Sequence, residues 1–99
     1  MYTTPSMTDS KIDQVAAAIE AIAHPSRLQI LLALSETQSL PASALQHHLQ
    51  LSVPVLSSHL THLTDQRLLS LQQQDNEPYY SLANTSLQKV VALIQTTYL

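Results

Sequence analysis

The 99-residue chain has no cysteine and no glycine, and charged residues make up only 11% of it. The absence of cysteine excludes disulfides, thiol switches, thiolate metal sites and cysteine nucleophiles. The absence of glycine excludes glycine-rich phosphate loops of the dinucleotide-binding and P-loop kinds. Four Lys and Arg against seven Asp and Glu give a net charge of −3 with neutral histidines. The chain therefore lacks a broad basic face that would bind nucleic acid by charge alone.

Long apolar runs are also missing, since the longest apolar cluster is the segment 30–34. A membrane span needs about 18 consecutive apolar residues, so we expect no association with a membrane. Residues 1–10 have neither a positive region nor an apolar stretch, so they do not form a secretory signal. These absences predict a cytoplasmic protein, and an apolar content of 44% is enough for one domain.

The first half of the domain shows helical periodicity. Residues 1–9 are polar and are predicted to form a flexible arm. Ser10, with Asp13 three residues later, resembles a capping box, and apolar residues at helical spacing predict a helix over 11–23. Pro25 is expected at the first position of a second helix, whose apolar circumference predicts a central place in the core.

Two further helices are separated by a tight connection. A short helix is predicted over 41–49, after the break at Pro41. Ser52 is a favourable N-cap for the next helix, which is predicted over 53–66 and buries one face. The opposite face carries short polar side chains. Its members are Pro54, Ser57, Ser58, Thr61 and Asp65, with Val55 and His62 on one flank.

The period changes after this helix. Leu69 and Leu71 alternate with polar residues, the segment 75–77 reads as a turn, and 78–82 reads as a second strand, which together predict an antiparallel hairpin. The chain closes on a helix with apolar residues at helical spacing. These are Leu87, Val90, Val91, Ile94 and Tyr98. The predicted fold is mainly α with a small hairpin: a winged helix-turn-helix over 10–99, with about five helices and a two-stranded wing.

This order of elements predicts DNA binding through the fourth helix and the hairpin. A helix with short polar side chains fits the DNA major groove, where hydroxyls contact bases and phosphates and Val55 contacts a thymine methyl group. The hairpin is expected to contact the backbone or the minor groove. The candidate DNA-binding residues are Pro54, Val55, Ser57, Ser58, Thr61, His62, Arg67, Gln73 and Asn76. For Arg27, a phosphate contact and a structural contact to a carbonyl or carboxylate are left as equal alternatives.

Three segments of the chain resemble the ArsR/SmtB repressors. Residues 24–31 (HPSRLQIL) are similar to the family signature DPTRLRIL, and residues 49–60 (LQLSVPVLSSHL) to its helix-turn-helix LGLSQSTVSRHL. Residues 78–82 (PYYSL) resemble the second wing strand VYYRL. The resemblance implies a homodimeric repressor of operator DNA, with the first and last helices at the dimer interface. The residues expected there are Ile12, Val15, Ile19, Leu87, Val91, Ile94 and Tyr98.

The chain departs from the family at its sensor positions. The thiolate pair of the third helix falls at Pro41 and Ser43, and residues 84–99 contain no His, Asp or Glu to supply the metal ligands of the last helix. The wing has serine and amide side chains where the family commonly has arginine, and Gln50 stands at the position of the turn glycine. We therefore expect no metal, no cofactor and no thiol chemistry, and the inducing signal is left open.

Other functions were weighed against DNA binding. His59 and His62 are three residues apart on one helix, but no carboxylate repeats in phase with them, so a metal site is disfavoured. Histidines beside DNA instead predict tighter binding on mild acidification. No gly-flanked nucleophile or carboxylate pair supports an enzyme. With only four Lys and Arg, a winged helix that binds protein instead of DNA remains the alternative.

Overall fold

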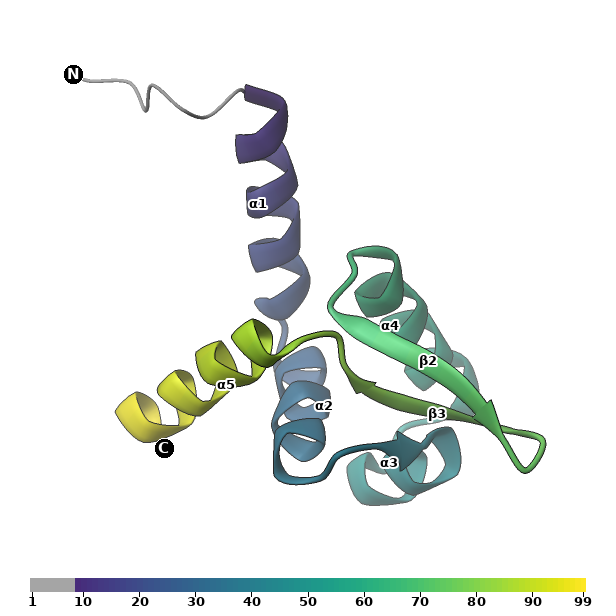
Figure 1. The fold of residues 1–99 in the computed structure, drawn as a ribbon. Coiled ribbons are helices and arrows are strands. Elements are labelled where there is room, and N and C mark those ends of the chain that lie inside the picture. Colours follow the sequence, from purple (N-terminus) through teal and green to yellow (C-terminus); the bar gives the residue numbers. More distant parts are fainter. Residues whose placement is uncertain (1–8) are drawn as a thin grey trace.

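The computed structural model describes residues 9–99, which form five helices and a small antiparallel sheet (Figure 1). The order along the chain is α1 (Asp9–Ile22), α2 (Pro25–Glu36), β1 (Leu40–Pro41), α3 (Ala42–Leu49), α4 (Val53–Asp65), β2 (Leu69–Gln74), β3 (Glu77–Leu82) and α5 (Thr85–Tyr98). The predicted winged helix-turn-helix is confirmed. The predicted arm lies outside the described residues except for Asp9, at which α1 begins.

The core is built around α2, as its apolar circumference predicts. Ile30, Leu31 and Leu34 of α2 are fully buried, and the helix packs against α1, α3, α4, α5 and β3. The remaining buried apolar residues come from every other helix and from the start of β2. They are Ala21, Leu45, Leu56, Leu60, Leu63, Leu68, Leu69, Leu87 and Val91. Within residues 10–99 no polar side chain is fully buried, so the core is held by apolar packing.

Two helix starts differ from the sequence prediction. Ser10 lies inside α1 and is not its N-cap, because the helix already begins at Asp9. Ser52 occupies the N-cap position of α4, but its side chain makes no capping hydrogen bond there. α2 instead has a histidine cap, since Nδ1 of His24 accepts a hydrogen bond of 3.2 Å from the backbone N–H of Ser26.

The sheet contains one strand that the sequence did not predict. Leu40 and Pro41, which were predicted as a break and as the start of a helix, form β1 and pair with Tyr80 and Tyr79 of β3. The strand order is therefore β1-β3-β2. β2 and β3 form the predicted hairpin, and β1 pairs with the other edge of β3. A two-residue strand shows no alternation along the sequence, and this is why periodicity did not reveal it.

The hairpin turn is tighter than predicted. Gln74 pairs with Glu77, so the loop consists of Asp75 and Asn76 alone, at φ values of 53° and 63°. Two consecutive left-handed residues form the type I′ turn that matches the twist of the flanking strands. Asp and Asn tolerate this region better than most residues, which explains how the wing closes without glycine.

The helix-turn-helix also turns without glycine. Gln50 follows α3 with φ 55° and ψ 41°, and its N–H donates to the carbonyl of Gln46 at 2.8 Å. This is the left-handed C-cap that glycine usually provides, at a cost of about 1 kcal/mol for a residue with a Cβ atom. The chain thus keeps the turn geometry and carries its steric cost.

Replacing Gln50 by glycine should therefore stabilise the protein. We expect Gln50→Gly to raise the free energy of unfolding by about 0.5 to 1 kcal/mol, because the left-handed conformation is no longer strained. Urea denaturation followed by circular dichroism measures the change. The control Gln88→Gly, at an exposed position inside α5, should instead lower it by about 1 kcal/mol. A loss of stability in Gln50→Gly would contradict the strain at this turn.

α1 and α5 project from the body of the protein (Figure 1). The principal extents are 50 × 27 × 22 Å and the radius of gyration is 14.8 Å, against about 13 Å for a compact domain of this length. Of the α1 side chains that the structure describes, only Ala21, near its C-terminal end, is fully buried. The helices among residues 9–99 all fall short of the length and hydropathy that a membrane crossing requires.

Candidate nucleic-acid interface

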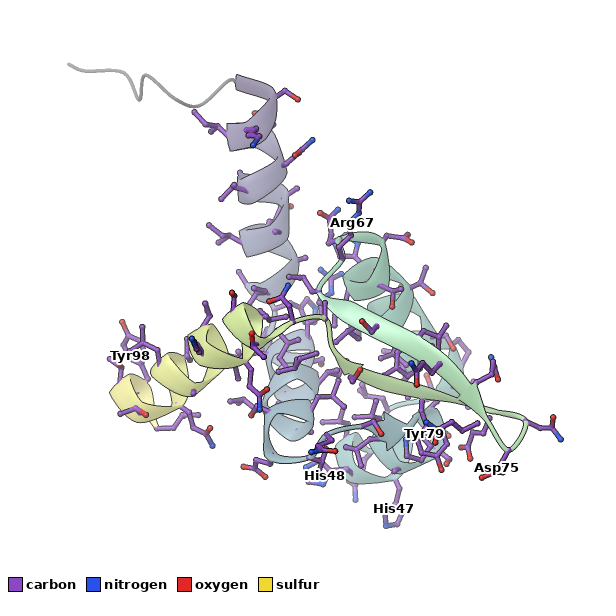
Figure 2. All side chains as sticks on the ribbon, viewed as in Figure 1. His47, His48, Arg67, Asp75, Tyr79 and Tyr98 are labelled. Carbon is purple, nitrogen blue, oxygen red and sulfur yellow. The ribbon has the colours of Figure 1, made fainter. Side chains whose placement is uncertain are left out.

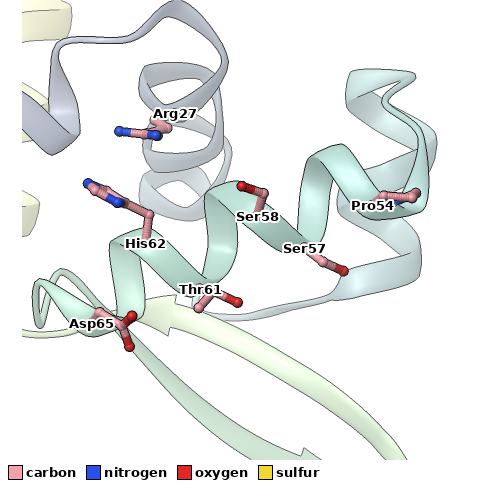
Figure 3. Close-up of a pocket in the computed structure, with 7 residues that line it drawn as sticks. All are labelled: Arg27, Pro54, Ser57, Ser58, Thr61, His62 and Asp65. Carbon is pink, nitrogen blue, oxygen red and sulfur yellow. The ribbon is translucent and has the colours of Figure 1, made fainter.

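The exposed face of α4 forms a shallow hollow together with α2. Its volume is about 400 Å³, and Figure 3 shows the side chains around it. The lining residues are Arg27, Pro54, Ser57, Ser58, Thr61, His62 and Asp65. Five of the nine residues predicted to bind DNA therefore lie around one hollow, which we call the α4 hollow.

The opposite face of α4 fixes this orientation. Leu56, Leu60 and Leu63 are buried, at the helical spacing that the sequence showed. Since these residues occupy the core side, the short hydroxyl side chains between them point outward. An exposed α-helix with small polar side chains has the width and chemistry that the major groove of DNA accepts.

The other four predicted residues lie away from the α4 hollow. Val55 is exposed near the start of α4, whereas Arg67 follows the end of that helix in the left-handed region. Figure 2 shows Arg67 at one end of the hairpin and Asp75 at the other. Gln73 and Asn76 are exposed on the wing beside Asp75. The predicted residues thus fall on α4, on its exit and on the wing tip.

The charges of this surface are sparse. Arg27 and Asp65 give the α4 hollow one fixed charge of each sign, and Asp75 places a carboxylate at the wing tip. Glu77, at the base of the same turn, accepts a hydrogen bond from Ser43 of α3. On a surface with so few cations, any contact with phosphates would depend mainly on neutral donors.

Arg27 and His59 connect α2 to α4. Nε of Arg27 donates to Nδ1 of His59 at 3.2 Å, and Nη1 donates to the carbonyl of Ala21 at 3.5 Å. The imidazole of His24 lies against that of His59, with ring centroids 4.7 Å apart and planes tilted by 55°. The spacing along the sequence gave no sign of this cluster, because 32 residues separate its two main partners.

The same cluster favours the neutral form of His59 by lowering its pKa. Burial lowers the pKa of His59 below its usual 6.5, and the charges of His24, Arg27 and His62 lower the pKa further. A neutral imidazole leaves Nδ1 free to accept the hydrogen bond from Arg27. Among residues 9–99, no three His, Asp or Glu side chains gather in a way that could bind a metal ion.

The lowered pKa of His59 predicts that acid destabilises the fold. At pH 8 the imidazole is neutral in both states, but below about pH 6.5 the unfolded chain takes up the proton first. The free energy of unfolding should therefore fall as the pH is lowered from 8 to 5.5. His59→Asn, which cannot titrate, should show a smaller fall, and the control Gln72→Asn, at an exposed position on β2, the wild-type fall. Thermal unfolding across this range measures it, and identical curves for His59→Asn and wild type would contradict it.

The geometry defines the class of protein: helices α3 and α4 joined by a tight turn, followed by a hairpin, form a winged helix-turn-helix. Residues 24–70 match the family model described as bacterial regulatory protein, arsR family. The HTH-type transcriptional regulator YgaV of Escherichia coli K12 is 31% identical over 86 residues, which are 87% of each chain. The chain belongs to the ArsR family of transcriptional regulators.

Two further relatives cover much of the chain. The arsenical resistance operon repressor of Staphylococcus xylosus is 35% identical over 69 residues, 70% of this chain and 65% of that protein. A homodimeric winged helix-turn-helix DNA-binding domain of Mycobacterium bovis, a possible ArsR-family regulator, is 25% identical with a TM-score of 0.83. That likeness covers 97% of this chain and 88% of the other. The resemblance inferred from three short segments is thereby confirmed.

Proposed function

We propose that the protein is a homodimeric repressor that binds inverted-repeat operator DNA through α4 and the wing. The observation that carries the proposal is the α4 hollow, which brings Ser57, Ser58 and Thr61 onto one exposed surface. The hydroxyls of these side chains contact bases and phosphates, and Val55 meets a thymine methyl group. On the wing, the amides of Gln73 and Asn76 contact the sugar–phosphate backbone.

The proposed dimer buries the apolar stripes of the projecting helices. Most exposed large apolar side chains among residues 9–99 lie on α1 or on α5 and the C-terminal residue after it. An isolated 14-residue helix is marginal in water, so α1 needs a partner for the stripe formed by Ile12, Val15 and Ile19. A second copy of the chain supplies it, and the relative from Mycobacterium bovis is a homodimer.

The structure alters the expected contribution of α5 to this interface. Leu87 and Val91 were predicted there, but they are 8% and 1% exposed and belong to the core of the chain itself. Ile94 is half-buried and Tyr98 is exposed. Val90 and Leu93 are exposed on the same helix, although the sequence analysis did not select them. We therefore place Val90, Leu93 and Tyr98 at the interface, with Ile94 at its edge.

Polar substitution on the two projecting helices should dissociate the dimer. Ile19 is 61% and Leu93 is 65% exposed, so Ile19→Gln combined with Leu93→Gln leaves the core unchanged. We expect the wild type to sediment as a dimer and this variant as a monomer at micromolar concentration. The control Leu71→Gln, on exposed β2, should remain dimeric. A monomeric wild type would contradict the proposed assembly.

We propose that this regulator works without a metal or thiol sensor. The chain has no cysteine, and the two positions of the family's thiolate pair hold residues with structural roles. Pro41 pairs with Tyr79 in the sheet, and the hydroxyl of Ser43 is bonded to Glu77. α5 carries no His, Asp or Glu. The signal that releases the DNA is therefore of another kind.

Fluorescence anisotropy with the protein's own promoter region tests operator binding. We expect specific binding with an unusually shallow salt dependence, because few Lys and Arg are present to displace counterions. Ser57→Ala combined with Ser58→Ala should weaken promoter binding about tenfold or more and weaken binding to unrelated duplex much less. Ser39→Ala, at an exposed position before β1, is the control.

Two outcomes would contradict operator binding. If the wild type fails to bind promoter DNA even at low salt, the fold serves another task, and the protein-binding alternative gains. If the double alanine variant binds promoter as tightly as the wild type, the α4 face does not read the sequence.

A further inference from the structure

Arg27 has a guanidinium group that is only partly used by the fold. Its Nε and Nη1 atoms each donate one hydrogen bond, to His59 and to Ala21. A guanidinium group has five N–H donors, so the others have no hydrogen-bond partner within residues 9–99. The side chain is half-buried and lines the α4 hollow. Its unused donors therefore lie at the edge of the proposed DNA surface.

The position of Arg27 differs from that of the other three cations. Figure 3 shows Arg27 and His62 at the same end of the α4 hollow, with Pro54 and Ser57 toward the other end. Lys11 and Lys89 lie on the projecting helices α1 and α5, and Arg67 lies beyond the end of α4. α2 thus contributes one fixed positive charge, Arg27, to the α4 hollow.

His59 holds the guanidinium in place from the core side. Its Nδ1 atom accepts the hydrogen bond from Nε of Arg27, and its ring lies against the ring of His24, the N-cap residue of α2. The charged or titratable groups facing it are His24 and Arg27 from the α2 side and His62 on α4. A guanidinium group held by two hydrogen bonds has little entropy left to lose, and its remaining N–H donors suit phosphate oxygens.

We propose that Arg27 contacts a phosphate of the DNA backbone, and that His59 is the positioning residue that aims its guanidinium group at the DNA. The inference rests on the proposed function. It adds to α4 and the wing a third contact, from the start of α2. A phosphate contact of this kind fixes the protein on the duplex and carries no sequence information.

The salt dependence of DNA binding tests the contact directly. Each phosphate neutralised adds about 0.9 to the slope of log K against log salt, so Arg27→Met should reduce the slope by about 1.8 for a dimer. Affinity should fall by a similar factor for promoter and for unrelated duplex. Lys89→Met removes one charge from α5 and should leave the slope unchanged. Measurements are made at pH 8, where His59 is neutral.

Variants of His59 test its positioning role. The side-chain oxygen of His59→Asn can accept from Nε of Arg27 near the position of Nδ1, so this variant should keep the wild-type slope. His59→Leu has no acceptor and should lose part of the slope, although Arg27 is still present. If Arg27→Met does not fold, Arg27→Gln removes the charge but keeps a polar side chain with an N–H donor for His59.

The outcomes separate this inference from the proposed function. A lower melting temperature with an unchanged salt slope in Arg27→Met or Arg27→Gln would show a purely structural role and would overturn the inference alone. A wild type that does not bind DNA would overturn the proposed function and the inference with it. Equal slopes for His59→Asn and His59→Leu would remove the positioning role of His59.

Discussion

The packing of α2 against its neighbours is the constraint on which the rest of the structure depends. Its buried side chains Ile30, Leu31 and Leu34 meet the apolar faces of the surrounding helices, and each such side chain stabilises the fold by about 1.5 to 3 kcal/mol. Because α4 packs on this helix and buries Leu56, Leu60 and Leu63, the core fixes which face of α4 reaches the solvent. Apolar packing on the buried face of α4 therefore determines which side chains of this helix line the α4 hollow.

The same packing explains how a chain with so little charge can present a binding surface. No polar side chain of the described core is buried, so the few polar contacts between elements lie near the surface, and two of them adjoin the candidate DNA-binding surface. Arg27 with His59 ties α2 to α4, and Ser43 with Glu77 ties α3 to the wing. These two links adjoin the surfaces that are proposed to meet DNA. Loss of either hydrogen bond would disturb the proposed DNA-binding surface before it disturbed the core.

Most of the fold followed from periodicity in the sequence, and its departures have physical causes. The helices and the hairpin were predicted because each has a repeat long enough to detect. β1 was missed since two residues carry no period, and its pairing with Tyr79 and Tyr80 depends on the tertiary fold. For α5, apolar residues surround much of the helix. Which of them face the core depends on how the chain leaves β3, and periodicity does not contain that information.

The candidate site was predictable where it lies on one helix and unpredictable where it joins two. Ser57, Ser58 and Thr61 share a face by helical geometry alone, whatever the tertiary structure. Arg27 could be assigned to a phosphate or to a structural contact, and the sequence favoured neither. The structure shows why the two readings are compatible: two donors of the guanidinium group bond to His59 and Ala21, and the same side chain lines the α4 hollow with further donors.

In this regulator without thiols, the Arg27 side chain both bonds to His59 and lines the α4 hollow. A change that alters the acceptor on His59 acts on α2, on α4 and on the charge of the α4 hollow at the same time, because one side chain connects all three. Coupling between a signal and DNA binding requires two states of the protein that differ in affinity for DNA. A single hydrogen bond between two packed helices allows few alternative states. Since α1 and α5 pack on the same α2, a rearrangement at the proposed dimer interface would reach Arg27 through that helix. α2 is therefore the element that connects the proposed dimer interface to Arg27.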